Sequence, residues 1–253
     1  MREINKPSVG LLPLYLELYD ETSPNFSPMM RAFADETANR LESAGLKVYL
    51  TPVCRIESEF RAAVHAIEEA GAESIVTLHL AYSPSLECID ALMSTKLPVI
   101  VFDTTPTYDF AEKQDSTEVM ANHGIHGVQD MCSMLRRRKK LYWVEAGHMD
   151  HSDVLERVAK RARAASAAAA FRRARIGIIG KPFKGMGDFY VSADELRSSL
   201  GATVTELDAG TAKALANSIT QAEITREADH YKEVFSLHTN VGEGIWRSRR
   251  SLT

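Results

Sequence analysis

The sequence predicts an α/β fold, with a doubly wound parallel sheet followed by the start of a second α/β domain. Short runs of apolar residues alternate with longer segments in which apolar residues recur at helical spacing. Strands that alternate with helices in this way form a parallel sheet that is covered on both faces. The chain has 253 residues, of which 45% are hydrophobic and 25% are charged, so it is long enough for one large domain or two smaller ones.

The first strand and helix set the pattern for the N-terminal half. Residues 9–14 form a continuous apolar run, which predicts a strand buried on both faces. The next helix has Ser27 as its expected N-cap and Pro28 in its first position, and Gly45 suits its end. This pattern predicts a buried strand followed by a helix that packs on one face of the sheet.

The same unit repeats along the first half of the chain. Further strands are expected at residues 47–53, 74–80, 98–102 and 141–144, and further helices at residues 58–70, 83–93 and around His126. Five such units in about 150 residues match the flavodoxin-like strand order 2-1-3-4-5. The prediction is therefore an N-terminal doubly wound domain at residues 1–149.

The second half predicts a connecting helix and a smaller α/β region. Residues 150–174 are rich in Ala and Arg and predict one long helix with a shallow apolar face. Strands are then expected at 175–180 and 203–207, which are too few for a doubly wound sheet. We therefore expect residues 175–253 to be an incomplete second (central) domain that ends within a helix.

Composition and charge exclude several function classes. The net charge of −4 argues against a nucleic-acid surface, and the basic run at 136–140 is interpreted as a solvated helix end. The three cysteines have no CxxC spacing, which indicates free thiols in a reducing compartment. The N-terminus has no apolar signal region and no stretch approaches 18 apolar residues, so a cytoplasmic protein without membrane contact is expected.

The predicted strand order also indicates where a ligand would bind. In an open parallel sheet, ligands bind at the carboxyl ends of the strands where the strand order reverses, here between the first and third strands. The loops at 15–26, 79–84 and 103–122 meet there. They carry polar and aromatic side chains, namely Tyr15, Tyr19, Asp20, His79, Tyr82, Asp103 and Tyr108. Such a composition suits a small polar ligand, but it is also common in loops.

The stretch at 122–131 is the most unusual in the chain. Ile125, Val128, Cys132 and Leu135 recur at helical spacing and predict the inward face of a helix, which leaves His126 off that face. Asp130 follows His126 by one turn and could hold one of its ring nitrogens. Two glycines at 124 and 127 allow a ligand or another backbone to come close. The alternative is a capped helix start with two surface histidines.

Three other patterns are weaker. The glycine-rich segment at 180–189 lacks the Lys-Ser/Thr pair of a phosphate loop, so we interpret it as a tight turn that holds Phe183 and Met186 over a pocket. The cluster His148-Met149-Asp150-His151 could bind a metal, but a helix N-cap explains it better. A flavin protein is disfavoured because no phosphate-cradling loop follows residues 9–14.

Three segments together resemble the L-fucose/L-arabinose isomerase superfamily of metal-dependent aldose–ketose isomerases. Residues 78–84 are similar to the family's His-x-x-x-Ser-Pro segment, and residues 122–127 to its Asn-Gln-x-x-His-Gly segment. Residues 175–188 resemble the strand and loop that open the central domain. The order and spacing of these segments agree over nearly the whole chain.

The resemblance implies an oligomeric enzyme with active sites shared between subunits. Family members are about twice as long, and their Mn²⁺ (or other divalent metal) ligands lie downstream of residue 253. We therefore expect this chain to be an N-terminal and partial central region that holds no metal or catalytic residue by itself. The resemblance implies that the residues contacting a monosaccharide, in part from a neighbouring subunit, are His126, His123, Leu18, Tyr19, Phe183 and Met186.

Two positions depart from the family pattern. The family's glutamine in the Asn-Gln-x-x-His-Gly segment is His123 here, and its Gln-x-Leu-Tyr segment begins with Leu16. These departures affect which sugar would be bound. The alternative function is a non-catalytic sugar-binding or assembly module on a flavodoxin-like fold.

Overall fold

The structure, a computed structural model, describes residues 6–23, 25–109, 111–180, 183–187 and 191–236. The chain divides into two compact units, residues 1–169 and residues 170–253. Each unit is described by itself below. None of the helices in the described residues is long and apolar enough to cross a membrane.

The first unit is built on a five-stranded parallel sheet with the order β2-β1-β3-β4-β5, as the sequence predicts. Its strands are β1 (Ser8–Leu14), β2 (Lys47–Leu50), β3 (Ser74–His79), β4 (Val99–Asp103) and β5 (Tyr142–Ala146). Every residue of β3 is buried, because the strand lies in the middle of the sheet with helices on both faces. The predicted flavodoxin-like fold class is confirmed.

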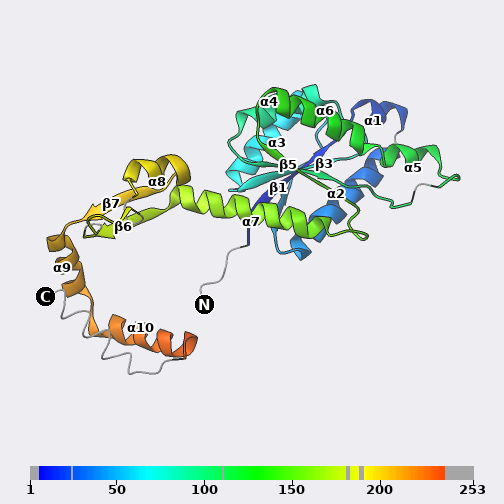
Figure 1. Ribbon diagram of the computed structural model, residues 1–253. Coiled ribbons are helices and arrows are strands. Elements are labelled where there is room, and N and C mark those ends of the chain that lie inside the picture. The colour runs from blue at the N-terminus through cyan, green and yellow to red at the C-terminus, as the bar shows by residue number, and fades with distance from the viewer. Residues whose placement is uncertain (1–5, 24, 110, 181–182, 188–190, 237–253) are drawn as a thin grey trace. The chain divides into compact units, whose positions relative to one another are not determined.

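Helices cover the two faces of this sheet in two groups (Figure 1). The helices that begin in this unit are α1 (Leu18–Thr22), α2 (Phe26–Ser43), α3 (Glu57–Glu69), α4 (Ser85–Ser94), α5 (Ser116–Ala121), α6 (Gly124–Arg137) and α7 (Val154–Arg173). Buried residues of α2 and α7 form one core cluster with one face of β1 and β3. Buried residues of α3, α4 and α6 form the other core cluster. The chain therefore passes from one face to the other between β2 and β3, which creates the expected strand-order reversal at β1 and β3.

Two local expectations are corrected. Helix α2 begins at Phe26, so Ser27 is inside its first turn, where its hydroxyl accepts hydrogen bonds from Arg31 instead of capping the helix. Strand β2 ends at Leu50 instead of residue 53, although the backbone amides of Thr51 and Cys54 still donate hydrogen bonds to Leu11 and Pro13 of β1. The end of α2 is as predicted, since Gly45 follows it with a φ of 93°, a conformation that glycine adopts without strain.

The second unit contains a two-stranded parallel sheet in its described residues. Strand β6 (Arg175–Ile179) pairs with β7 (Thr203–Leu207), and the helices are α8 (Ala193–Leu200), α9 (Ala209–Ser218) and α10 (Gln221–Val234). Several large apolar side chains of this unit are exposed, among them Ile179, Phe183, Leu215 and Phe235. The extent of a second domain at 175–253 stays a prediction, and the expected helix at the C-terminal end lies outside the described residues.

Candidate functional site

The loops after β1 and β3 meet at the carboxyl end of the sheet, where the strand order reverses. Burial raises the pKa of the Tyr19 hydroxyl, and the backbone and ring of Tyr82 lie close enough to affect that pKa as well. Tyr19 also packs edge-on against Tyr15 and Phe26, with ring centroids 5.5 Å apart in both pairs. Helix α1, which carries Tyr19, is therefore held between the β3–α4 loop and the aromatic side chains of Tyr15 and Phe26.

The first turn of α6 packs directly against the β3–α4 loop. A Cβ atom on Gly127 would lie 2.6 Å from Cδ2 of His79 and 3.0 Å from the Ser83 backbone nitrogen. A Cβ atom on Gly124 would lie 3.2 Å from the His79 carbonyl oxygen. The glycines therefore provide a close approach, but to the chain's own loop. Of the two expected neighbours of these glycines, a ligand or another backbone, the structure has the backbone of the chain's own β3–α4 loop, and both glycines are buried.

His79 is the buried centre of this contact, with 3% of its surface exposed. Burial lowers the pKa of its imidazole to about 4, and the Gly127 backbone and the Asp130 charge offset only part of that shift. Neither ring nitrogen of His79, nor the Ser83 hydroxyl, has a hydrogen-bond partner of normal geometry in the described part of the chain. His79 is therefore a neutral core residue near pH 7.

His123 and His126 lie together on the exposed side of the α6 start. Their rings meet edge to face, with centroids 4.3 Å apart and an interplanar angle of 87°. Both side chains are exposed, so His126 lies off the inward face of the helix as predicted. The inward face itself differs from the prediction, because Ile125 is 40% exposed and Met131 is fully buried. The buried glycines turn the helix so that position 125 faces outward.

Asp130 does not hold His126. Its Oδ2 accepts a hydrogen bond from the backbone amide of Ser85, 3.0 Å away, at the first residue of α4. A carboxylate is favourable there because the first amides of a helix have no partner within the helix. The predicted His126–Asp130 pair is thus replaced by a link between α6 and α4.

The predicted sugar-contacting residues fall into two groups. The first group comprises Leu18, Tyr19, His123 and His126. Their two segments both contact the β3–α4 loop, through Tyr19 with Tyr82 and through Gly127 with Ser83. Leu18 is 53% exposed. We call these four residues the motif surface. Phe183 and Met186 belong to the second unit and are 71% and 43% exposed. The roles of all six residues stay predictions.

The His148–His151 cluster forms a turn after β5. The Asp150 amide donates to Nδ1 of His148, 3.2 Å away, and Asp150 forms an ion pair with Arg40. Tyr108 stacks on His151 with ring centroids 4.0 Å apart. Among the residues that the structure describes, no group of three or more His, Cys, Asp or Glu side chains could hold a metal ion. These residues therefore do not fit a manganese site.

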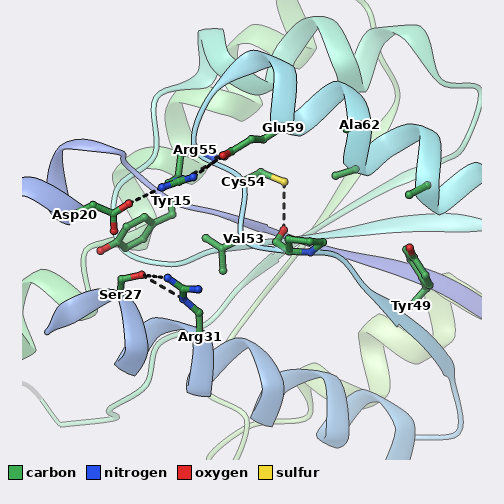
Figure 2. A pocket seen from close by; sticks show the side chains of 13 residues that line it. Tyr15, Asp20, Ser27, Arg31, Tyr49, Val53, Cys54, Arg55, Glu59 and Ala62 are labelled. Carbon is green, nitrogen blue, oxygen red and sulfur yellow. Dashed lines mark hydrogen bonds and ion pairs between the residues drawn. The ribbon is translucent and has the colours of Figure 1, made fainter. Parts of the chain in front are cut away.

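A cavity that the sequence did not predict lies between α2 and α3 (Figure 2). Its volume is about 540 Å³, within the usual range for small-molecule sites. It is lined by Tyr15, Asp20, Ser27, Arg31, Tyr49, Pro52, Val53, Cys54, Arg55, Glu59, Ala62, Ala63 and Ala66. We call it the α2–α3 cavity. The loop at 51–55 contributes Pro52, Val53, Cys54 and Arg55 to its lining.

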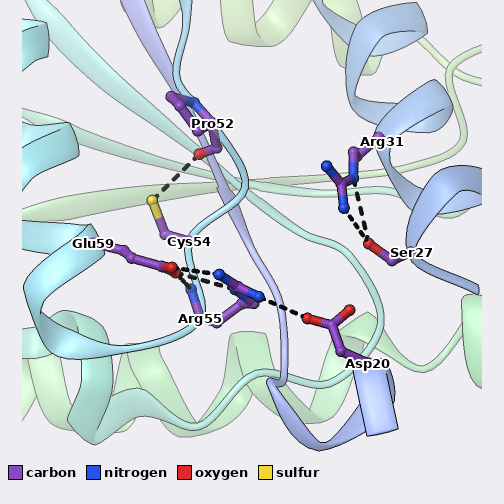
Figure 3. A network of polar contacts seen from close by, with 7 residues as sticks. All are labelled: Asp20, Ser27, Arg31, Pro52, Cys54, Arg55 and Glu59. Atoms are coloured by element: carbon purple, nitrogen blue, oxygen red, sulfur yellow. Dashed lines mark hydrogen bonds and ion pairs between the residues drawn. The ribbon is translucent and has the colours of Figure 1, made fainter. Parts of the chain in front are cut away.

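An ion-pair network closes one end of this cavity (Figure 3). Nη1 of Arg55 lies 2.7 Å from Asp20 Oδ2, and its Nη2 lies 2.5 Å from Glu59 Oε1. Hydrogen bonds to Glu59 and then Asp20 raise the pKa of Arg55, and Arg55 in turn lowers the pKa of Glu59. Burial raises the pKa of the adjacent Cys54 thiol to about 12, so this cysteine is protonated near pH 7 and is a poor nucleophile.

Part of this network was visible in the sequence. Tyr15 and Asp20 belong to the segment at 15–26, which the predicted strand order places at the ligand-binding edge of the sheet. Arg55 and Glu59 are four residues apart at a helix start, a spacing at which opposite charges pair. The contact between Arg55 and Asp20 spans 35 residues and depends on how the two loops meet. The cavity therefore had no local signal.

The chain is distantly related to L-arabinose isomerase. It is 24% identical over 234 residues to the L-arabinose isomerase of Shouchella clausii (strain KSM-K16), a match that covers 92% of this chain. The match covers 47% of that enzyme, so the chain spans about half the length of the curated relative. No family model matches the sequence.

A solved structure gives a weaker likeness. It is an ABC transporter periplasmic solute binding protein from Actinobacillus succinogenes 130z with bound D-allose, at 13% identity and a TM-score of 0.28. The alignment covers 86% of this chain and 66% of that one. A likeness of this size carries no argument about function.

Proposed function

We propose that this chain is the N-terminal part of a metal-dependent aldose–ketose isomerase of the fucose/arabinose isomerase type. The distant relationship to L-arabinose isomerase over most of the chain supports the proposal. One structural observation carries it: Gly127 in one motif segment packs against His79 and Ser83 in another. These two segments are far apart in the sequence, and their contact holds His123 and His126 at the ligand end of the sheet.

In this proposal the motif surface binds and orients the sugar. Isomerisation moves a hydrogen between C1 and C2 of the sugar and requires an acid, a base and groups that orient the hydroxyls. The exposed imidazole of His126 has two ring nitrogens that can form hydrogen bonds with a sugar hydroxyl. The edge contact with His123 limits the positions that the His126 ring can take.

The divalent ion of such an enzyme polarises the substrate oxygens. The described residues of this chain contain no group suited to hold it, so the proposal assigns metal ligation to other residues of the assembled enzyme. The contribution of this chain is then substrate orientation in an active site shared between subunits.

The experiment is to isolate the tagged chain, with whatever binds to it, from the cells that make it. We expect the isolated assembly to isomerise L-arabinose or L-fucose in the presence of Mn²⁺, and the His126→Ala variant to lose most of that activity. The Gln129→Ala variant is the matched control, because Gln129 is an exposed residue of the same helix. An assembly that binds a sugar without isomerising it would support the alternative, a non-catalytic sugar-binding module.

A further inference from the structure

The α2–α3 cavity has a polar end and an apolar end. The polar end is formed by the Arg55 network and by Arg31 and Ser27 on α2, which face it in Figure 2. The apolar end is formed mainly by Tyr49, Val53 and the alanines of α3. None of the four residues of the motif surface lines this cavity.

Small side chains on α3 create the space at the apolar end. Ala62, Ala63 and Ala66 lie within about one turn of α3 and border the cavity. A larger residue such as leucine at any of these positions would occupy part of the volume. The apolar end offers few hydrogen-bond partners, so it suits the hydrocarbon part of a ligand better than a polyol.

The two arginines of the cavity differ in their partners. Arg55 is neutralised by Asp20 and Glu59. Arg31 donates from Nε and Nη2 to the Ser27 hydroxyl, at 3.3 Å and 2.9 Å, and in the described part of the chain it forms no ion pair. A guanidinium has five N–H donors, so Arg31 retains three for a ligand.

The hydroxyl of Tyr15 is a second unused polar group. The side chain is 1% exposed and lies between Asp20 and Ser27 at the polar end (Figure 2). Its hydroxyl has no hydrogen-bond partner among the described residues, although a buried hydroxyl normally has one. A bound polar group at this end would supply that partner directly or through a water molecule.

We propose that the α2–α3 cavity binds a small monocarboxylate with an apolar body. The carboxylate meets the free donors of Arg31, and the apolar body lies along Ala62, Ala63 and Ala66. Planar guanidinium groups bind carboxylates through two parallel hydrogen bonds. The lining has four charged side chains, and the positive charges of Arg31 and Arg55 balance the negative charges of Asp20 and Glu59. A ligand with a single negative charge therefore fits better than a dianion such as phosphate.

The test is a titration of the purified chain with phenylacetate, measured by calorimetry. Phenylacetamide is the matched probe, because it has nearly the same shape without the charge. We expect a dissociation constant of about 1 mM or lower for phenylacetate and binding at least about tenfold weaker for phenylacetamide. No heat of binding from phenylacetate up to about 10 mM, or equal affinity for the two compounds, overturns the proposal.

Two variants of the chain locate the site. Arg31→Gln removes the free cation and is expected to weaken phenylacetate binding at least about tenfold. Ala66→Leu, at a half-buried position, fills the apolar end and should weaken both probes. Arg61→Gln is the charge-matched control, because Arg61 pairs with Glu57 on α3 and does not line the cavity. An equal loss in Arg61→Gln, or no loss in Arg31→Gln, contradicts the assignment.

Discussion

Gly127 lies directly against the buried ring of His79, with room for a hydrogen atom but not for a methyl group. A Cβ atom at position 127 would come within 2.6 Å of the imidazole and 3.0 Å of the Ser83 backbone. Glycine is a poor helix former, by about 1 kcal/mol relative to alanine, so its presence inside α6 reflects this close packing. The contact fixes the start of α6 against the β3–α4 loop.

The first prediction is that Gly127→Ala destabilises the chain. Overpacking a buried contact lowers the free energy of unfolding by about 1–3 kcal/mol, which exceeds the gain in helix propensity. Urea denaturation followed by circular dichroism measures the change. Gln129→Ala, on an exposed position of the same helix, should stay within about 0.5 kcal/mol of the parent chain. A Gly127→Ala chain as stable as the parent would show that the loop yields without strain.

The second prediction is a loss of stability in acid that depends on His79. The pKa of His79 is about 4 in the folded chain and 6.5 when unperturbed, so the unfolded chain binds the proton more tightly. The stability is therefore complete above about pH 6.5 and declines as the pH falls toward 4, by about 3 kcal/mol in total.

His79→Leu removes this titration. Between pH 7 and pH 5 the parent chain should lose about 2 kcal/mol more free energy of unfolding than the variant. Urea midpoints at several pH values for both chains measure the difference. Parallel pH profiles would mean that His79 is protonated in the folded chain without penalty.

The third prediction concerns His126 in the assembled enzyme. His126→Ala should lower isomerase activity by about 10²-fold or more, the scale of a positioned acid, base or orienting group. Folding should be nearly unchanged, because the side chain is exposed and surface changes usually fall within about 0.5 kcal/mol.

Subunit mixing tests whether the His126 contribution crosses between subunits. The His126→Ala assembly is mixed with a second variant that lacks one of the metal ligands outside this chain, under conditions where subunits exchange. Partial recovery of activity is expected for shared active sites. If exchange occurs without recovery, His126 acts in its own subunit or in no active site.

The fourth prediction is that the purified 253-residue chain has no aldose–ketose isomerase activity with Mn²⁺. The described residues include no cluster suited to bind the ion, and the chain spans about half of its curated relative. A coupled ketose assay with L-arabinose and L-fucose measures this. Metal-dependent turnover of about 1 per second or faster would contradict the prediction.

The strand order was predictable because buried strands and amphipathic helices leave strong periodic signals. Residues 9–14 are a nearly continuous apolar run and residues 74–80 are rich in Ile, Val and Leu, and the chain places them side by side as β1 and β3. The helix boundaries were less accurate at α2, where Ser27 looked like a cap but packs inside the first turn. Local preferences locate an element well and its first residue poorly.

Features of the site were predictable only where they depend on residues of a single segment. His126 was correctly placed on the outer side of its helix, but Ile125 was assigned to the core because glycines were not counted as inward-facing residues. The partner of Asp130 is 45 residues away at Ser85, and the partner of Arg55 in the cavity is 35 residues away at Asp20. Such contacts depend on how loops from different strands meet, which periodicity does not encode.

The hydrogen bond from the Ser85 amide to Asp130 gives the motif surface a spectroscopic reporter. Asp130 lies one helical turn from His126, and Ser85 lies on α4, so a ligand that shifts α6 changes the length of this bond. The Ser85 amide should then move in a ¹H–¹⁵N correlation spectrum when a sugar binds to the assembled enzyme, and stay in place when phenylacetate fills the α2–α3 cavity. A single resonance would thus separate occupancy of the two sites.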